Sequence, residues 1–155
     1  MNYDEISQDA GTYIVILSSD ENRPVLIGAC GPLQLQPGYY LYAGSALGPG
    51  GLRARVGRHL GGTGQPRWHI DFLRQVTLPH EAWLYTGHDR QEHNWANALG
   101  NMPDVEATIP GLGASDCSCA THLFYTHSRP SITAFNNSLH NFGYGATARL
   151  LQLQL

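Results

Sequence analysis

The sequence predicts a mixed α+β domain that begins with antiparallel strands and continues with helices and strands in alternation. Residues 11–44 hold β-branched and aromatic runs separated by polar or Pro-Gly turns, which is typical of antiparallel strands. Beyond residue 50, segments with apolar residues at helical spacing alternate with short apolar runs. The resulting order of strand, strand, helix, strand and helix indicates the α+β class.

The first strands follow from local composition. Residues 12–17 (TYIVIL) form a β-branched and aromatic run, which predicts a buried strand. A polar turn precedes a short second strand over 25–29, and Pro37-Gly38 marks the turn before a strand over 39–44 (YYLYAG).

A helix is expected directly after the glycine-rich loop 47–51. Leu52, Val56 and Leu60 recur at i, i+4 and i+8, which places them on one face of that helix. The remaining expectations are helices over 68–76, 90–99 and 130–139 and strands over 81–85 and 122–125.

Length and composition exclude several classes of protein. The 155 residues correspond to one domain, and the hydrophobic fraction of 42% is too high for a disordered chain. No run of about 18 apolar residues predicts a membrane span, so no membrane partner is expected. Three cysteines form no paired framework, which together with a polar N-terminus favours the cytoplasm. We expect a flexible lead-in over 1–10, one domain over 11–140 and a C-terminal extension over 141–155.

The charge is distributed unevenly. All nine positive residues are arginine, and twelve acidic residues give a net charge of −3, which argues against a generic basic coat. Five of the arginines nevertheless fall within 52–75 beside one acid, Asp71. This stretch is either a phosphate-binding track or a solvated helix face.

Three separated features carry the candidate chemistry. Gly11-Thr12-Tyr13 opens one strand and Tyr42-Ala43-Gly44 ends another, Arg55 and His59 share one side of the expected helix, and Glu92 begins a later helix. Taken singly, strand tyrosines are commonly packing residues and a first-turn glutamate commonly offsets the helix dipole.

In this order, the features resemble the GIY-YIG nuclease superfamily. The longer strings GYYLYAGSA (38–46), RWHIDFL (67–73) and GLGASDCSCATHLF (111–124) resemble its stand-alone, single-domain Uri-type branch. The resemblance covers residues 11 to 127. Thr12 and Ala43 stand where the superfamily triplets have isoleucine, at second positions that are expected to point into the core.

The resemblance implies a GIY-YIG-like sheet of three antiparallel strands flanked by helices, in β-β-α-β-α order, and metal-dependent hydrolysis of DNA phosphodiesters. By that resemblance Tyr13 positions or deprotonates the attacking water and Tyr42 lies beside it. Arg55 holds the phosphate, His59 is an auxiliary base or phosphate contact, and Glu92 binds Mg²⁺ or Mn²⁺. A tyrosine needs a cationic neighbour to act as a base at neutral pH.

Further candidates surround this set. Contacts to nucleic acid are expected from Gly44, Arg53, Arg58, Arg67 and His69. Superfamily members also use an asparagine, for which Asn97, Asn136 and Asn137 are candidates. The partner is single- or double-stranded DNA, with RNA as an alternative, and double-strand cutting would call for a homodimer.

A second cluster, Asp116-Cys117-x-Cys119-x-x-His122, is either a brace at the edge of the site or a zinc site. Its Cys-x-Cys spacing is tighter than in common zinc sites, which favours the brace. Two other functions therefore stay open beside the nuclease: a non-catalytic nucleic-acid-binding module on the same scaffold, and a zinc-binding or partner-binding protein.

Overall fold

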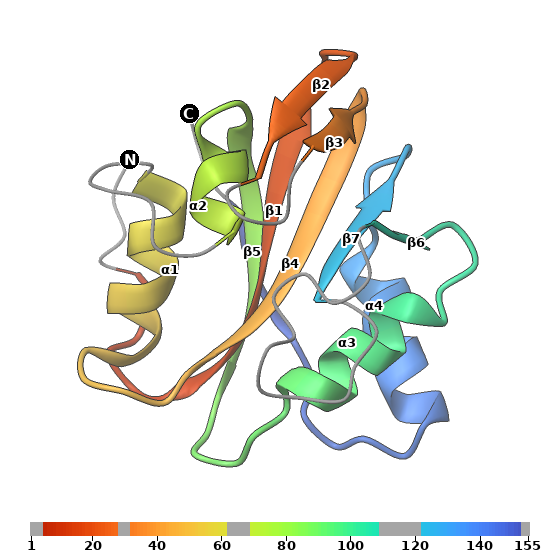
Figure 1. Cartoon of the computed structure of the whole chain (residues 1–155). Coiled ribbons are helices and arrows are strands. Elements are labelled where there is room, and N and C mark those ends of the chain that lie inside the picture. Colours follow the sequence, from red (N-terminus) through yellow and green to blue (C-terminus); the bar gives the residue numbers. More distant parts are fainter. Residues whose placement is uncertain (1–4, 28–31, 62–68, 109–121, 153–155) are drawn as a thin grey trace.

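The computed structural model describes residues 5–27, 32–61, 69–108 and 122–152, and in this part of the chain it shows a mixed α+β fold (Figure 1). The strands are β1 (Gly11–Ser19), β2 (Arg23–Leu26), β3 (Pro32–Leu35), β4 (Gly38–Ala46), β5 (Leu78–Thr86), β6 (Glu106–Ala107), β7 (Leu123–Thr126) and β8 (Arg149–Gln152). The helices are α1 (Gly51–Gly61), α2 (His69–Arg74), α3 (Glu92–Gly100) and α4 (Ile132–Asn141).

The main sheet is larger than the three strands expected. It has six antiparallel strands in the order β6-β7-β4-β1-β5-β8, and β2 pairs with β3 in a separate two-stranded sheet. The expected core of β4, β1 and β5 would have two open edges. Strand β7 covers β4 and strand β8 covers β5, which satisfies backbone groups that an open edge leaves unpaired.

Both chain segments expected to lie outside the domain contribute to it. Strand β8 comes from the expected extension over 141–155 and continues the sheet. At the other end, Ile6 is fully buried, and the carbonyls of Ser7 and Asp9 accept hydrogen bonds from the first residues of α1. Short terminal segments lack a periodic pattern of their own, so only the pairing with β5 and α1 reveals them.

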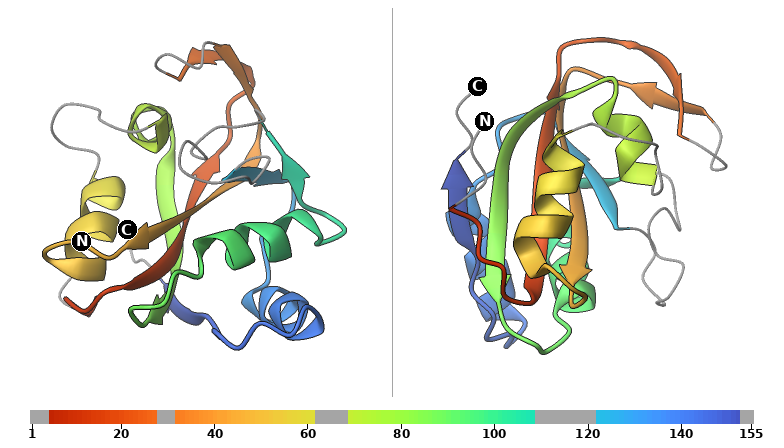
Figure 2. Two further views of the ribbon diagram at one scale, coloured as in Figure 1. Left: turned by 60° about the horizontal axis from the view of Figure 1, so that its bottom comes forward. Right: turned by 90° about the vertical axis from the view of Figure 1, so that its left-hand side faces the viewer.

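Strand β1 is buried on both faces because helices cover both sides of the sheet. Tyr13, Val15 and Leu17 belong to one hydrophobic cluster with α1 and α2. Ile14 and Ile16 belong to a second cluster with α3 and α4. Figures 1 and 2 show α1 and α2 on one side of the central strands and α3 and α4 on the other. A doubly covered strand explains the unbroken apolar run TYIVIL.

Helix α1 confirms the periodicity argument. Leu52, Val56 and Leu60 are all fully buried and face β1, β4 and β5. Thr12 and Ala43, the two departures from the isoleucine triplets, are fully buried as expected. Within the described ranges, no helix has the length and apolar character needed to cross a membrane.

Candidate active site

The two motif glycines hold the strands and Tyr13 in close contact. Gly44 lies opposite Tyr13 in the β1–β4 register, and a Cβ on Gly44 would lie 2.6 Å from Cζ of Tyr13. A Cβ on Gly11 would lie 2.7 Å from Cδ1 of Leu52 and would collide with the carbonyl of Tyr85. Each glycine is therefore required by space, because any larger side chain would displace the phenol or the helix.

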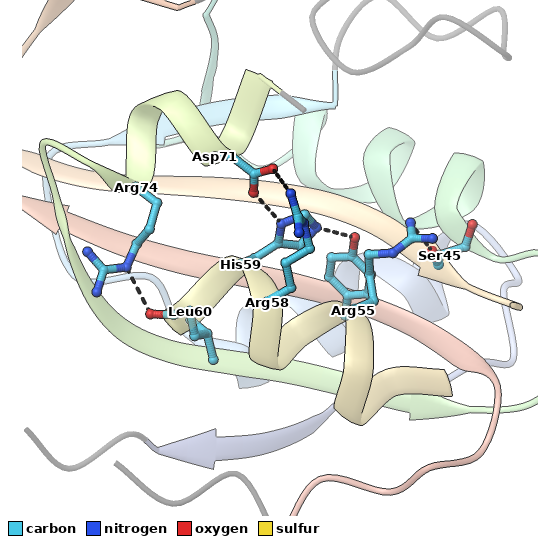
Figure 3. Close-up of polar contacts among 8 residues, drawn as sticks. Ser45, Arg55, Arg58, His59, Leu60, Asp71 and Arg74 are labelled. Carbon is cyan, nitrogen blue, oxygen red and sulfur yellow. Dashed lines mark hydrogen bonds and ion pairs between the residues drawn. The ribbon is translucent and has the colours of Figure 1, made fainter. Parts of the chain in front are cut away.

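A hydrogen-bonded row of side chains joins β1, α1 and α2. The Tyr13 hydroxyl lies 3.0 Å from Nε2 of His59, and Nδ1 of His59 lies 3.0 Å from Oδ1 of Asp71. Figure 3 shows the part of this row formed by Asp71 and His59. The ring of Tyr42 from β4 meets His59 edge-on, with centroids 5.9 Å apart. Both expected tyrosines and the expected histidine therefore meet in one place.

A second row joins α1 to α3 through β4. Arg55 Nη1 donates a hydrogen bond to the carbonyl of Ser45 over 3.3 Å (Figure 3). The Ser45 hydroxyl donates to Oε1 of Glu92 over 3.1 Å. Arg55 also interacts with the Tyr13 phenol through its positive charge and a side-chain hydrogen bond. Arg55 therefore links the two rows. All five expected catalytic residues lie around the start of β1 and the end of β4.

Glu92 is a buried carboxylate among basic side chains. It is 5% exposed at the start of α3. Arg90 lies 3.5 Å from Oε1, His93 Nε2 lies 3.9 Å from the same oxygen, and His122 Nδ1 lies 3.9 Å from Oε2. Burial among these groups and the Ser45 hydroxyl fixes the direction in which Glu92 presents its oxygens.

Burial dominates the electrostatics of Tyr13. Burial raises the pKa of the Tyr13 phenol well above its usual value, and the nearby Tyr42 adds to this. Arg55 lowers that pKa by its charge and hydrogen bond, but burial outweighs it. Arg55 is thus the kind of cationic neighbour that a basic tyrosine needs, although burial outweighs its effect on the pKa in the protein without metal or substrate. Tyr13 is a neutral phenol at pH 7.

His59 is neutral for a related reason. Burial lowers the pKa of its imidazole below the usual value, while the hydrogen bond and charge of Asp71 oppose that shift. Arg55 and Arg58 lower the pKa further. A neutral imidazole has one nitrogen free to accept a proton.

The donor set at Glu92 fits a hard divalent cation. Mg²⁺ commonly binds through one carboxylate, several waters and substrate oxygens. Glu92 supplies the carboxylate and Ser45 a neighbouring hydroxyl oxygen. Among the residues that the structure describes, no group of three or more His, Cys, Asp or Glu side chains forms a closed metal site. Glu92 is therefore the residue that would hold the expected Mg²⁺, and waters and substrate oxygens would supply the remaining ligands.

Two of the arginines expected to contact nucleic acid are hydrogen-bonded or ion-paired within the fold. Arg53 donates to the carbonyl of Ile6, and Arg58 lies 3.5 Å from Oδ2 of Asp71, so both contribute to the fold. Arg74 likewise donates to the carbonyl of Leu60 (Figure 3) and to that of Thr77. Arg67 and the side chain of His69 lie outside the described residues. The arginine-rich stretch is thus partly structural.

Sequence analysis missed the roles of Asp71 and Ser45. Asp71 was noted only as the single acid in the basic stretch, although it stands within the RWHIDFL string. Ser45 directly follows the motif glycine Gly44, and this adjacency is the sequence feature that could have indicated a place for Ser45 at the site. Nothing in the sequence placed His122 beside Glu92, because these residues approach only through β7 and α3.

The three candidate asparagines have different surroundings. Asn136 on α4 donates to the carbonyl of Ala148 and accepts from its amide, and Asn97 donates to the Tyr144 hydroxyl. Asn137 is exposed. Of the cysteine string, Asp116, Cys117 and Cys119 lie outside the described residues. His122 is buried, and its carbonyl accepts a hydrogen bond from the amide of Ala43.

Comparison with known proteins gives one match. Residues 12–144 match the model of the family described as Domain of unknown function DUF123. The match spans all five candidate catalytic residues. No curated protein and no solved structure matches the chain.

Proposed function

The chain belongs to the DUF123 family, and we propose that it is a divalent-metal-dependent endonuclease that hydrolyses DNA phosphodiester bonds. The proposal assigns the cluster to a GIY-YIG-type active site. It takes nucleic acid as the partner and Mg²⁺ or Mn²⁺ as the cofactor.

One observation carries this proposal. Side chains from β1, β4, α1 and α3, which are far apart in the sequence, meet around the paired glycine motifs. Tyr13 contacts His59, and Arg55 reaches Glu92 through Ser45. A cluster with a phenol, an imidazole, a guanidinium and a carboxylate contains the groups that phosphodiester hydrolysis needs. Placement against the helix dipole accounts for an acidic residue in a first helical turn, but not for its burial beside Ser45 and His122.

The proton path runs through Tyr13 and His59. As the water oxygen bonds to phosphorus, the water proton passes to the Tyr13 oxygen, and the Tyr13 proton passes to Nε2 of His59. The bond between phosphorus and the leaving sugar oxygen then breaks, that oxygen takes a proton from solvent water, and His59 later returns its extra proton to solvent. This path keeps Tyr13 a phenol before and after the step, in agreement with its raised pKa. Neutral His59 is the acceptor that the path requires.

The charge that develops on the phosphoryl oxygens is met by Arg55 and the metal. A guanidinium can donate two parallel hydrogen bonds to a phosphate, and Arg55 lies at the junction of the two rows. The metal held by Glu92, when bound, supplies Lewis-acid stabilisation of the phosphate and of the leaving oxygen. Glu92 keeps its orientation through the hydrogen bond from Ser45.

A cleavage assay tests the proposal. Purified protein is incubated with end-labelled single- and double-stranded DNA in Mg²⁺ or Mn²⁺, with EDTA alongside. We expect metal-dependent cleavage that falls by about 100-fold or more in Arg55→Gln and in Glu92→Gln. Glu92→Gln preserves side-chain size and can still accept the Ser45 hydrogen bond, whereas Arg55→Gln removes the guanidinium and shortens the side chain.

Matched controls are Arg23→Gln and Glu106→Gln, which alter exposed residues of β2 and β6. These variants should cleave at the wild-type rate. Cleavage that persists equally in all four variants would come from a contaminating nuclease and would overturn the proposal. A protein that shifts DNA on a gel without cutting it would instead be the non-catalytic binding module.

A further inference from the structure

Asp71 contacts the candidate site, but the resemblance assigns no role to this residue. It lies on α2, and both of its carboxylate oxygens are engaged. Oδ1 lies 3.0 Å from Nδ1 of His59, and Oδ2 lies 3.5 Å from Nη2 of Arg58 (Figure 3). The side chain is 12% exposed. A carboxylate held this way points in one direction, toward the far side of the imidazole from Tyr13.

The chemistry of these groups selects one tautomer of His59. An ionised carboxylate only accepts hydrogen bonds, so Nδ1 of His59 must carry a proton to bond with Asp71. In the neutral imidazole, Nε2 is then an acceptor, and the Tyr13 hydroxyl 3.0 Å away is the donor. The other neutral tautomer would set the Nδ1 lone pair against the carboxylate. Both hydrogen bonds of the row are satisfied in only one neutral arrangement.

We propose that Asp71 is a positioning residue that holds the His59 proton on Nδ1 and so leaves Nε2 to take the proton of Tyr13. Its effect on the rate rests on the proposed hydrolysis, whereas its effect on the tautomer does not. The protein would then contain a row in which Asp71 orients His59, and His59 serves Tyr13.

The surroundings of His59 favour the neutral form. Burial and the two guanidiniums of its own helix lower the imidazole pKa, against the opposing effect of Asp71. Among the described residues, the ionisable groups that face the row are Tyr13 on β1, Tyr42 on β4, Arg55 and Arg58 on α1, Asp71 on α2 and Glu92 on α3.

In the proposed reaction, Asp71 does not take up a proton. The proton of Tyr13 moves to Nε2, and the resulting imidazolium keeps its original proton on Nδ1. The Asp71 carboxylate then faces a positive ring at 3.0 Å, which stabilises the charge where it forms. Before the step, the positive charge of Arg58 lies beside the Asp71 carboxylate. A variant of Arg58 therefore tests whether Asp71 acts on His59 directly or only as part of the Arg58–Asp71 ion pair.

The test measures the His59 tautomer directly. Long-range ¹H–¹⁵N correlation spectra of the full-length protein, with His59 assigned through His59→Gln, report which ring nitrogen is protonated. In the wild type we expect Nδ1 to be protonated and Nε2 to be free. Asp71→Asn can present its amide N–H to the ring, which favours the proton on Nε2 instead. Arg58→Gln breaks the Arg58–Asp71 pair but should leave the wild-type tautomer.

Cleavage kinetics provide the second readout. If the protein cuts DNA, Asp71→Asn should lower kcat by about 100-fold or more with KM changed less than about threefold, because the loss concerns proton transfer rather than binding. Arg58→Gln is compared by tautomer and melting temperature alone, because Arg58 is itself an expected nucleic-acid contact. A purely structural Asp71 would lower the melting temperature in both variants without changing the tautomer.

The outcomes separate the two proposals. A wild-type His59 protonated on Nε2, or a tautomer unchanged in Asp71→Asn, would overturn the role of Asp71 even in an active nuclease. A wild type that cuts no DNA would overturn the proposed function. The spectra would still decide whether Asp71 sets the tautomer.

Discussion

Gly44 determines where the Tyr13 phenol lies. The two residues face each other across the β1–β4 pairing, and the phenol occupies the space that a side chain at position 44 would fill. The glycine is therefore a steric requirement of the site. The same reasoning applies to Gly11, which lies against Leu52 and the backbone of β5.

Replacement of Gly44 tests this packing. In Gly44→Ala, the new Cβ would lie 2.6 Å from Cζ of Tyr13, so the phenol or the strand must shift. We expect the free energy of unfolding to fall by about 1–3 kcal/mol, as for other overpacked cores. Urea denaturation measures the change. Gly48→Ala is the control, because no atom lies within 4 Å of the Cβ it would add. Equal stability of the two variants would contradict the steric argument.

At the scale of elements, α1 performs two tasks with two sets of residues. Its apolar face packs on the sheet through Leu52, Val56 and Leu60. The adjacent face carries Arg55 and His59, four residues apart and so on one side of the helix. Because the apolar residues fix the rotation of the helix, they also fix the direction of the functional pair.

The connection between α4 and β8 depends on one side chain. Asn136 donates to the Ala148 carbonyl over 3.1 Å and accepts from the Ala148 amide over 2.8 Å, directly before β8. This pairing gives Asn136 a structural role between α4 and β8.

Loss of this contact should loosen β8. Asn136→Ala leaves the backbone groups of Ala148 without their partner, so the free energy of unfolding should fall by about 1–3 kcal/mol. Amide hydrogen exchange should accelerate in residues 149–152 more than in β1. Asn137→Ala, at an exposed neighbouring position, should change neither quantity. Slow exchange in β8 of the Asn136 variant would show that the strand is held by its pairing with β5 alone.

At the scale of the whole molecule, the buried row limits stability on both sides of neutral pH. The pKa of His59 is lowered on folding, so below about pH 6.5 the unfolded chain binds a proton that the folded one does not. The pKa of Tyr13 is raised on folding, so above about pH 10 the unfolded chain loses a proton that the folded one keeps. The free energy of unfolding therefore falls toward acid and toward alkali.

Urea denaturation across the pH range measures both limbs. His59→Gln should reduce the slope of the free energy of unfolding against pH, on the acid side, by up to about the contribution of one proton. Tyr13→Phe should weaken the alkaline limb without abolishing it, because burial also raises the pKa of Tyr40 and Tyr125. Identical pH profiles in the wild type and both variants would mean that these groups titrate normally in the folded protein.

The sequence predicted the local elements better than their assembly. Helix α1 is confirmed, since its apolar spacing determines both its existence and its buried face. Strands β1, β4 and β5 were each expected, although each is longer than predicted. Strands β3, β6 and β8 were missed, because short edge strands carry little pattern and depend on a partner strand. The number of strands was therefore underestimated.

For the candidate site, the sequence supplied the residues and the fold supplied their relations. Spacing alone indicated that Arg55 and His59 share a helix side, and the glycine motifs marked Tyr13 and Tyr42. Asp71 and Ser45 gained their roles only when α2 and the end of β4 came near α1 and α3. Local sequence determines rotation and register within an element, because those depend on neighbours a few residues away. Which carboxylate meets which imidazole, and whether burial keeps Tyr13 protonated, was decided by tertiary packing, since distance and exclusion of water exist only between elements that have come together.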